Sequence, residues 1–411
     1  MLTYDQQLPL IGVQGSSPSD RTARRSHRLR SGVTPADLGL NQLSKKLLSA
    51  QAGTLVFTGL LYAWLGLSSD WATLAPHCIG IVIIAIVWLY YYWHPGKRNE
   101  WVIADGLFVL LLIMSLGLIV SSSQYVVASL RRPLIDSWLS ATDAMFGISV
   151  PQLVAWTRAH GPIAAWLHTA YFTLVPQFLL TVVVLGFVLR DRARLWEYAF
   201  HFHFCALVTL AAFAIVPADS AFTHYGFQSL IDQGRFIDHF QGLRAGTLTA
   251  IPFNNMEGLV SFPSFHVAGG LIVTWAFRKN RLLFWPLAVL NASLTAATFM
   301  TGAHYVTDVV ATFFVFAASL CAYRYCGFAA LFQTATGAIT NTSRTLAPVG
   351  ESVGRDQTIE NVIAVDQRHI RQNALNQACF RTICEAGVAT SCGNAVADWI
   401  DNSAHQTATN H

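Results

Sequence analysis

Two residues near the end of the apolar part of the chain have types and spacing suited to phosphate chemistry. His304 and Asp308 are four residues apart, which on a helix places both on one face, where the carboxylate reaches the imidazole. A carboxylate behind a histidine fixes its tautomer and stabilises the imidazolium, an arrangement that suits a nucleophile. We therefore predict that His304 attacks phosphorus to form a phosphohistidine and that Asp308 orients it.

A second histidine lies at a predicted helix start. Pro263 and Ser264 directly precede an apolar stretch, a pattern in which Ser264 caps the helix and its first free N–H groups bind phosphate. His266 would then sit in the first turn and protonate the departing oxygen. A helix N-terminus disfavours a protonated histidine, so the negative charge of the bound phosphate must offset this effect.

Arginines are the candidates for stabilising the charge of a bound phosphate. Arg132 is favoured because Pro133 follows it, and Arg244 because its connection leads into the Ser264 segment. For Arg131 and Arg235, a solvated or headgroup-facing charge is the stronger interpretation. The predicted phosphate-binding set is Arg132, Arg244, Ser264 and Arg131.

Two acidic residues follow these arginines along the chain. Asp136 and Asp143 are seven residues apart on a probable amphipathic helix. A structural role, such as capping or pairing, and a role in substrate binding are equally open for them.

The elements that must position these residues are membrane helices. Of the 411 residues, 53% are hydrophobic and 12% are charged, about half the roughly 25% charged residues of ordinary soluble domains. Since ~20 apolar residues cross a bilayer core, the sequence predicts an all-α polytopic membrane protein with about eight transmembrane helices. The spans lie near 51–69, 72–93, 101–121, 166–189, 195–217, 265–277, 282–300 and 304–325.

Basic residues orient these helices. With the N-terminus inside, the even connections carry positive charge, as the positive-inside rule requires: Lys97 and Arg98, then Arg190, Arg192 and Arg194, then Arg278, Lys279 and Arg281. Connections 122–165, 218–264 and 301–303, with all candidate chemistry, then face out. The sequence thus predicts a multi-pass protein of the inner (plasma) membrane with both termini cytosolic and its site on the outer or periplasmic face.

Composition divides the chain into three parts. Residues 1–46 form a predicted disordered basic tail, 47–328 a transmembrane catalytic domain, and 329–411 a polar cytosolic tail. The seven cysteines form no CxxC pair, and no Asp/Glu cluster suggests a two-metal site. We therefore expect no metal, no cofactor and no nucleic-acid partner.

Three blocks together resemble the signature of a known enzyme superfamily. These are the RRP segment at Arg131, the PSFH segment ending at His266 and the HYVTD segment from His304 to Asp308. They resemble the type 2 phosphatidic acid phosphatase superfamily, and in detail its inositolphosphotransferase branch, which includes inositol phosphorylceramide synthases. The resemblance covers roughly 125–325 and implies a six-helix phosphatase-type core. It also implies the same roles for His304, Asp308 and His266.

The chain departs from the broad superfamily pattern at three positions. Tyr125 and Thr298 stand where that pattern has a phosphate-binding Lys and Arg, and Phe265 replaces a glycine. The inositolphosphotransferase branch is more similar at the second and third blocks. The resemblance therefore implies a membrane-embedded phosphotransferase that acts on lipid-linked phosphate and transfers to a polyol or sugar.

Other functions remain open at this stage. A lipid phosphate or diphosphate phosphatase differs only in using water as acceptor. A non-enzymatic transporter of anionic lipid would show charged residues near mid-span and broken helices. A bis-histidine haem carrier would show a Soret band. The partners expected for the leading prediction are the lipid-linked phosphate and the membrane lipids.

Overall fold

The structure is a computed structural model that describes residues 35–93, 100–231 and 234–328. Within these ranges the chain is built from helices and a single parallel pair of two-residue strands, β1 (Ser68–Ser69) and β2 (Ala250–Ile251). Six helices are long and apolar enough to cross a membrane, or seven if one bent pair counts as a span. The predicted all-α polytopic membrane fold is confirmed.

The helix count differs from the eight predicted spans in two places. The span expected at 166–189 is a pair, α7 (Gly161–Phe172) and α8 (Leu174–Val183) with its extension η1 (Val184–Val188), bent by 46°. The span expected at 265–277 is the 12-residue helix α12 (Phe265–Ala276). At 1.5 Å per residue it rises only about 18 Å, short of the roughly 30 Å hydrocarbon core.

The first helix also begins earlier than its apolar pattern indicates. Helix α2 (Pro35–Leu65) includes residues 35–46, which the sequence places in a disordered tail. Its first part is polar, so hydropathy alone gives no sign of it. The rest of the predicted tails, residues 1–34 and 329–411, lies outside the described residues.

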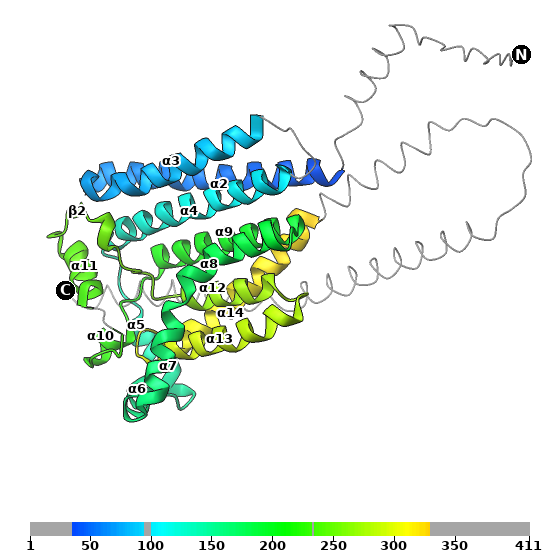
Figure 1. Cartoon of the computed structure of the whole chain (residues 1–411). Helices are drawn as coiled ribbons and strands as arrows, with labels where there is room; N and C mark the ends of the chain where they lie inside the picture. The colour runs from blue at the N-terminus through cyan, green and yellow to red at the C-terminus, as the bar shows by residue number, and fades with distance from the viewer. Residues whose placement is uncertain (1–34, 94–99, 232–233, 329–411) are drawn as a thin grey trace, which may run out of the picture. The chain divides into compact units, whose positions relative to one another are not determined.

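The helices form two neighbouring groups with α9 between them (Figure 1). On one side lie α2, α3 (Trp71–Trp93) and α4 (Glu100–Ala128), and α4 packs against both α2 and α9 (Arg192–Ile215). On the other side α12 packs against α9, α13 (Arg281–Met300) and α14 (Val306–Ala322). The main apolar core joins α4, α9 and α12 through residues such as Leu116, Cys205 and Ile272.

Short helices gather at one end of the bundle, where α4, α9 and α13 end and α12 and α14 begin (Figure 1). We call this the site end. Its short elements are α5 (Asp136–Met145), α6 (Val150–Ala159), α10 (Ala221–Tyr225), α11 (Gly234–Ala245) and the 3₁₀ turn η2 (Phe253–Asn255). The strand pair also lies here, since Ser68 follows α2 and pairs with Ala250.

The opposite end, the basic end, carries the positive connections at Arg190–Arg194 and Arg278–Arg281. Side-chain caps begin helices there: Asp191 accepts from the Arg194 N–H, and Asn280 accepts from the Leu283 N–H. The Arg278 guanidinium also pairs with Glu197 at 2.8 Å, joining α9 to α12. These two basic connections and the candidate histidines therefore lie at opposite ends of the helices.

Candidate active site

His304 lies in the turn that leads into α14, not on the helix itself. Its imidazole Nδ1 is 2.8 Å from the Ser261 carbonyl oxygen and 3.3 Å from Asp308 Oδ2. Asp308 reaches back because it sits in the first turn of α14, where its Oδ2 also accepts from the Tyr305 N–H at 3.0 Å. The predicted pairing is confirmed, but a capping-box turn makes it, in place of one continuous helix face.

These partners define the tautomer of His304. Both groups facing Nδ1, a carbonyl and a carboxylate, are acceptors, so Nδ1 must carry a proton. In the neutral imidazole, Nε2 is then the atom with a free lone pair. The side chain is buried, with only 5% of its surface exposed, and Asp308 is completely buried beneath it.

Ser264 links His304 to the start of α12. Its hydroxyl lies 3.2 Å from His304 Nε2, and Ser264 is the N-cap, as predicted, because the same oxygen accepts from the Val267 N–H. With Val267 donating, the serine proton is directed towards Nε2. The potential nucleophile therefore faces the N-terminus of α12, where free N–H groups favour an anion.

His266 lies in the first turn of α12, beside a tyrosine that the sequence analysis did not identify. The rings of His266 and Tyr171 of α7 are stacked, with centroids 4.3 Å apart. The centroids of His266 and His304 are 6.5 Å apart, so the two rings do not contact each other directly. This spacing allows one phosphoryl group to contact both imidazoles. Nothing in the local sequence around Tyr171 indicates this contact, which joins α7 to the start of α12.

Asp143 holds the start of α14 from a different helix. Its Oδ2 accepts from the Val306 N–H at 2.9 Å, and its Oδ1 accepts from the Thr307 N–H at 2.8 Å and from the Thr307 hydroxyl at 2.6 Å. The carboxylate, 1% exposed, thus caps the helix that carries Asp308. Of the two readings open at the sequence level, these contacts support the structural one.

Asp136, two turns earlier on α5, binds the same segment. Its Oδ1 accepts from the Tyr305 hydroxyl at 3.0 Å, and its Oδ2 accepts from the Asp219 N–H at 2.9 Å. Burial, and then the charge of Asp136, raise the pKa of the Tyr305 hydroxyl, which keeps it protonated as a donor. The seven-residue spacing therefore gives α5 a carboxylate face that supports the turn around His304.

Asp219 connects this support to the histidine. The Ser261 hydroxyl donates to the Asp219 carbonyl, and the Ser261 carbonyl accepts from His304. Burial, together with the nearby charge of Asp136, raises the pKa of the Asp219 carboxyl to about 7, although Thr223 and Arg244 act in the opposite direction. Arg244 is thus close enough to this segment to influence its charge.

The predicted phosphate-binding arginines lie at the site end but do not touch the histidines. Arg244 donates to the Arg132 carbonyl at 3.0 Å, which ties α11 to the RRP loop. The Arg132 side chain is exposed, and Arg131, also exposed, adopts a φ of 56° with its guanidinium against Gly246. In the described part of the chain, no hydrogen bond or ion pair joins these three arginines to His304 or His266.

The residues at the two missing cation positions make neutral contacts. The Tyr125 hydroxyl lies 2.8 Å from His239 Nδ1 and accepts from the Glu257 N–H at 2.9 Å. The Thr298 carbonyl accepts from the His304 N–H at 2.9 Å. Arg235, the remaining arginine considered, pairs with Glu257 at 2.9 Å while 65% of its side chain is exposed. This pairing is consistent with the solvated charge that the sequence favours.

The part of the chain that carries both histidines matches a known family model. Residues 137–322 match the family model described as the PAP2 superfamily. The match supports that superfamily. We call residues 137–322 the PAP2 segment. It contains both histidine motifs and runs from α5 to α14, whereas the RRP loop and helices α2, α3 and α4 precede it. No curated protein and no solved structure matches the chain.

The match to the PAP2 superfamily model suggests a lipid phosphatase or phosphotransferase activity, and the described structure brings His304 and His266 near each other within the matched residues. Across residues 35–93, 100–231 and 234–328, no group of three His, Cys, Asp or Glu side chains is placed to hold a metal ion. The hydrogen bonds of His304 to Ser261, Asp308 and Ser264 are of the kind that prepare an imidazole for attack.

Proposed function

We propose that this chain is a membrane-embedded phosphotransferase that acts on lipid-linked phosphate through a phosphohistidine. His304 Nε2 forms a bond to phosphorus while the bond from phosphorus to the lipid oxygen breaks. His266 gives its proton to that leaving oxygen. In the second half, His266 takes a proton from the acceptor hydroxyl, whose oxygen attacks phosphorus and releases His304.

The observation that carries this proposal is the hydrogen bonding of His304. Its Nδ1 is committed to Ser261 and Asp308, so the lone pair of Nε2 is aimed at the N-terminus of α12. A fixed tautomer and a buried carboxylate are the features that stabilise the imidazolium-like charge developing during attack. The ring of Tyr171 stacks on His266, the second imidazole, whose centroid lies 6.5 Å from that of His304.

The charge of the phosphate needs cations, and we assign these to Arg132, Arg244 and Arg131. All three belong to the RRP loop and α11 at the site end, where Arg244 bonds to the loop. Arg131 and Arg132 are exposed and Arg244 is half-buried, so their side chains can turn towards a bound phosphate, while Ser264 and the N–H groups of α12 bind it from the helix start.

The acceptor in this proposal is a polyol or sugar hydroxyl, in keeping with the resemblance of the PSFH and HYVTD blocks to the inositolphosphotransferase branch. Hydrolysis is the alternative, and it follows the same first half with water in place of the acceptor. A transporter finds one supporting feature in the 46° bend between α7 and α8. A transport function, however, does not explain the hydrogen bond from His304 Nδ1 to Asp308.

We further propose that the site faces the outer side of the inner (plasma) membrane. The described basic connections lie at the end of the helices opposite to His304, and such connections remain in the cytosol. The lipid chain of the substrate stays in the bilayer while its phosphate enters the site end. A thiol probe at Gln241→Cys, an exposed position on α11 at the site end, should react from the outside, and labelling from the cytosolic side alone contradicts this orientation.

The test of the mechanism is covalent labelling. Purified protein in nanodiscs is incubated with a radiolabelled lipid phosphate or diphosphate, and the enzyme is assayed for acid-labile, base-stable label. His304→Gln should abolish both the label and turnover. The matched control is His77→Gln on α3, an exposed histidine outside the PAP2 segment, which should retain both.

The acceptor is tested in the same preparation. The labelled enzyme is divided among buffer, inositol, glycerol and sugars, and the product is separated by chromatography. Formation of a phosphorylated acceptor at the expense of free phosphate supports transfer, whereas free phosphate in every tube means hydrolysis. An unchanged label in His304→Gln overturns the mechanism for both acceptors.

A further inference from the structure

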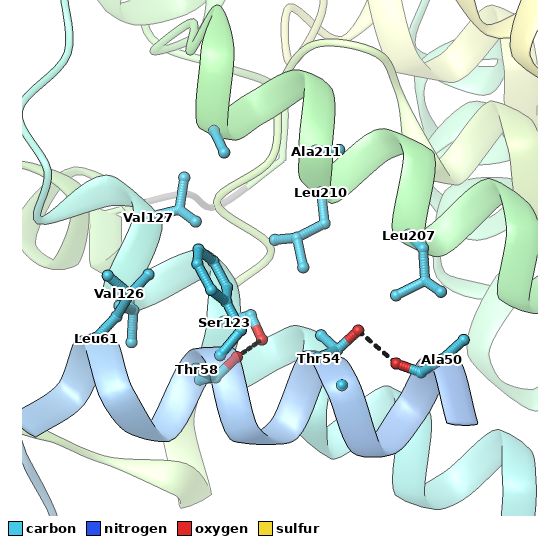
Figure 2. Close-up of a pocket in the computed structure, with 13 residues that line it drawn as sticks. Ala50, Thr54, Thr58, Leu61, Ser123, Val126, Val127, Leu207, Leu210 and Ala211 are labelled. Atoms are coloured by element: carbon cyan, nitrogen blue, oxygen red, sulfur yellow. Dashed lines mark hydrogen bonds between the residues drawn. The ribbon is translucent and has the colours of Figure 1, made fainter. Parts of the chain in front are cut away.

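A groove opens between α2, α4 and α9, on a part of the bundle separate from His304. Its volume is about 440 Å³. Figure 2 shows Thr54 and Thr58 of α2 on one wall and Leu207 and Leu210 of α9 on the facing wall. Two of its three walls, α2 and α4, precede the PAP2 segment. Most of the groove is therefore formed by helices outside the residues that match the superfamily.

The groove lies in the half of the bundle nearest the site end. It follows α2 from Ala50 to Leu61, and it includes Val127, next to the last residue of α4, and Ala214, next to the last residue of α9. From Ala50 to Leu61 the helix rises roughly 16 Å, at 1.5 Å for each of the eleven steps. This length is close to half of the ~30 Å hydrocarbon core, which is the depth of one leaflet.

The walls offer nothing to a polar ligand. The polar lining residues already bond within the protein: the Thr54 hydroxyl donates to the Ala50 carbonyl, and the hydroxyls of Thr58 and Ser123 lie 2.6 Å apart (Figure 2). The remaining lining residues are aliphatic or aromatic, or are glycine. An occupant must therefore be apolar along its whole length.

The groove is also continuous with the lipid-facing surface of α2. Phe57, which lines the groove, is 58% exposed, and its neighbours Val56 and Leu60 are 61% and 66% exposed. Large apolar side chains at this depth of a spanning helix face hydrocarbon. In contrast, Leu210 on the facing wall is only 8% exposed. A chain from the bilayer can thus enter sideways and reach the buried side of α9.

We propose that this groove holds one acyl chain of a bilayer phospholipid from the leaflet at the site end. The apolar walls, the one-leaflet length and the opening towards hydrocarbon each fit such a chain. The bound lipid fills space between the added helices and α9 of the core, and it is distinct from the lipid phosphate that reacts at His304. This inference does not depend on the proposed phosphotransfer.

The test uses a glycine that lines the groove. A Cβ at Gly53 meets no atom within 4 Å, so Gly53→Phe fits on α2 and places its ring in the groove. Gly59 on the same helix has the same free surroundings but does not line the groove, so Gly59→Phe is the matched control. Ala211→Phe fills the groove from α9 and serves if Gly53→Phe fails to fold.

Each protein is reconstituted into nanodiscs of one synthetic phosphatidylglycerol and released into native mass spectrometry at an energy that strips loosely held lipid. The wild type and Gly59→Phe should retain one lipid of the synthetic mass. Gly53→Phe should lose it by about tenfold or more, since displacing only two methylene groups removes that much affinity. Equal retention by Gly53→Phe and the wild type, or a retained species of another mass, overturns the proposal.

Discussion

Replacing Asp143 with asparagine tests whether the turn at His304 depends on a remote helix cap. The aspartate accepts three hydrogen bonds from the first turn of α14 through both of its oxygens. Asparagine keeps the size but offers one acceptor, so its NH₂ group faces the Val306 N–H as donor against donor. The substitution removes a charge but leaves the shape of α5 unchanged.

The expected magnitude follows from these contacts. Loss of one hydrogen bond to a charged group costs about 1.5–3 kcal/mol, and loss of the negative charge at a helix N-terminus costs about 0.3–1 kcal/mol. The free energy of unfolding should therefore fall by about 2–4 kcal/mol. Because Asp308 lies on the displaced helix, a shift of ~1 Å should lower kcat up to about 100-fold.

The assay measures kcat, KM and the unfolding midpoint in nanodiscs with the labelled lipid phosphate described above. Asp143→Asn should lower kcat and the midpoint while KM stays within about twofold, since the residue binds backbone and no substrate. Asp238→Asn on α11, an exposed carboxylate, is the control and should leave all three unchanged. A raised KM with an unchanged kcat and midpoint refutes the positioning role and indicates instead that Asp143 binds substrate.

Two further substitutions test the surroundings of the site. Burial, with the charge of Asp136, raises the pKa of Asp219 to about 7, so the stabilising effect of its protonated form is present at low pH and lost as the pH rises through about 7. Asp219→Asn should therefore flatten the pH dependence of the unfolding midpoint between pH 4 and 7. An unchanged slope contradicts the assignment. Gly302 has a φ of +95°, and a Cβ there would lie 2.4 Å from the Phe227 ring. Gly302→Ala should therefore lower the free energy of unfolding by about 1–3 kcal/mol and lower activity. Gly117→Ala, at a position with open surroundings, is the control and should leave thermal unfolding nearly unchanged.

Much of the fold was predictable because the solvent imposes a strong pattern. A spanning helix must hide every backbone polar group, so long apolar stretches identify α3, α4 and α9 directly. Local signals were equally reliable where neighbours in sequence make the contact: Ser264 caps α12 three residues before Val267, and Asp308 binds the turn four residues after His304. A pattern confined to one or two helical turns predicts its own contacts, because local backbone geometry fixes the distances between its residues.

Hydropathy failed where length or bending depends on packing. The polar start of α2 carries no apolar signal, and α12 is shorter than a span because the PSFH turn begins inside the bundle. Where α12 approaches α8, a Cβ at Gly269 would lie 2.6 Å from Phe178, so these helices approach closely. The bend between α7 and α8 has a local cause in Pro176, which has no N–H to bond the Phe172 carbonyl. The stacking of Tyr171 on His266 has no such local signal.

The sequence by itself determined the membrane class, the start of α12 and the pairing of His304 with Asp308, because each depends on composition or on spacing within one turn. Only the tertiary structure decided that Asp143 caps α14, since its partners Val306 and Thr307 lie more than 160 residues away along the chain. The stacking of Tyr171 and the groove beside α9 likewise belong to tertiary packing. Contacts between distant segments leave no periodic trace in either segment, so they appear only when the helices are assembled.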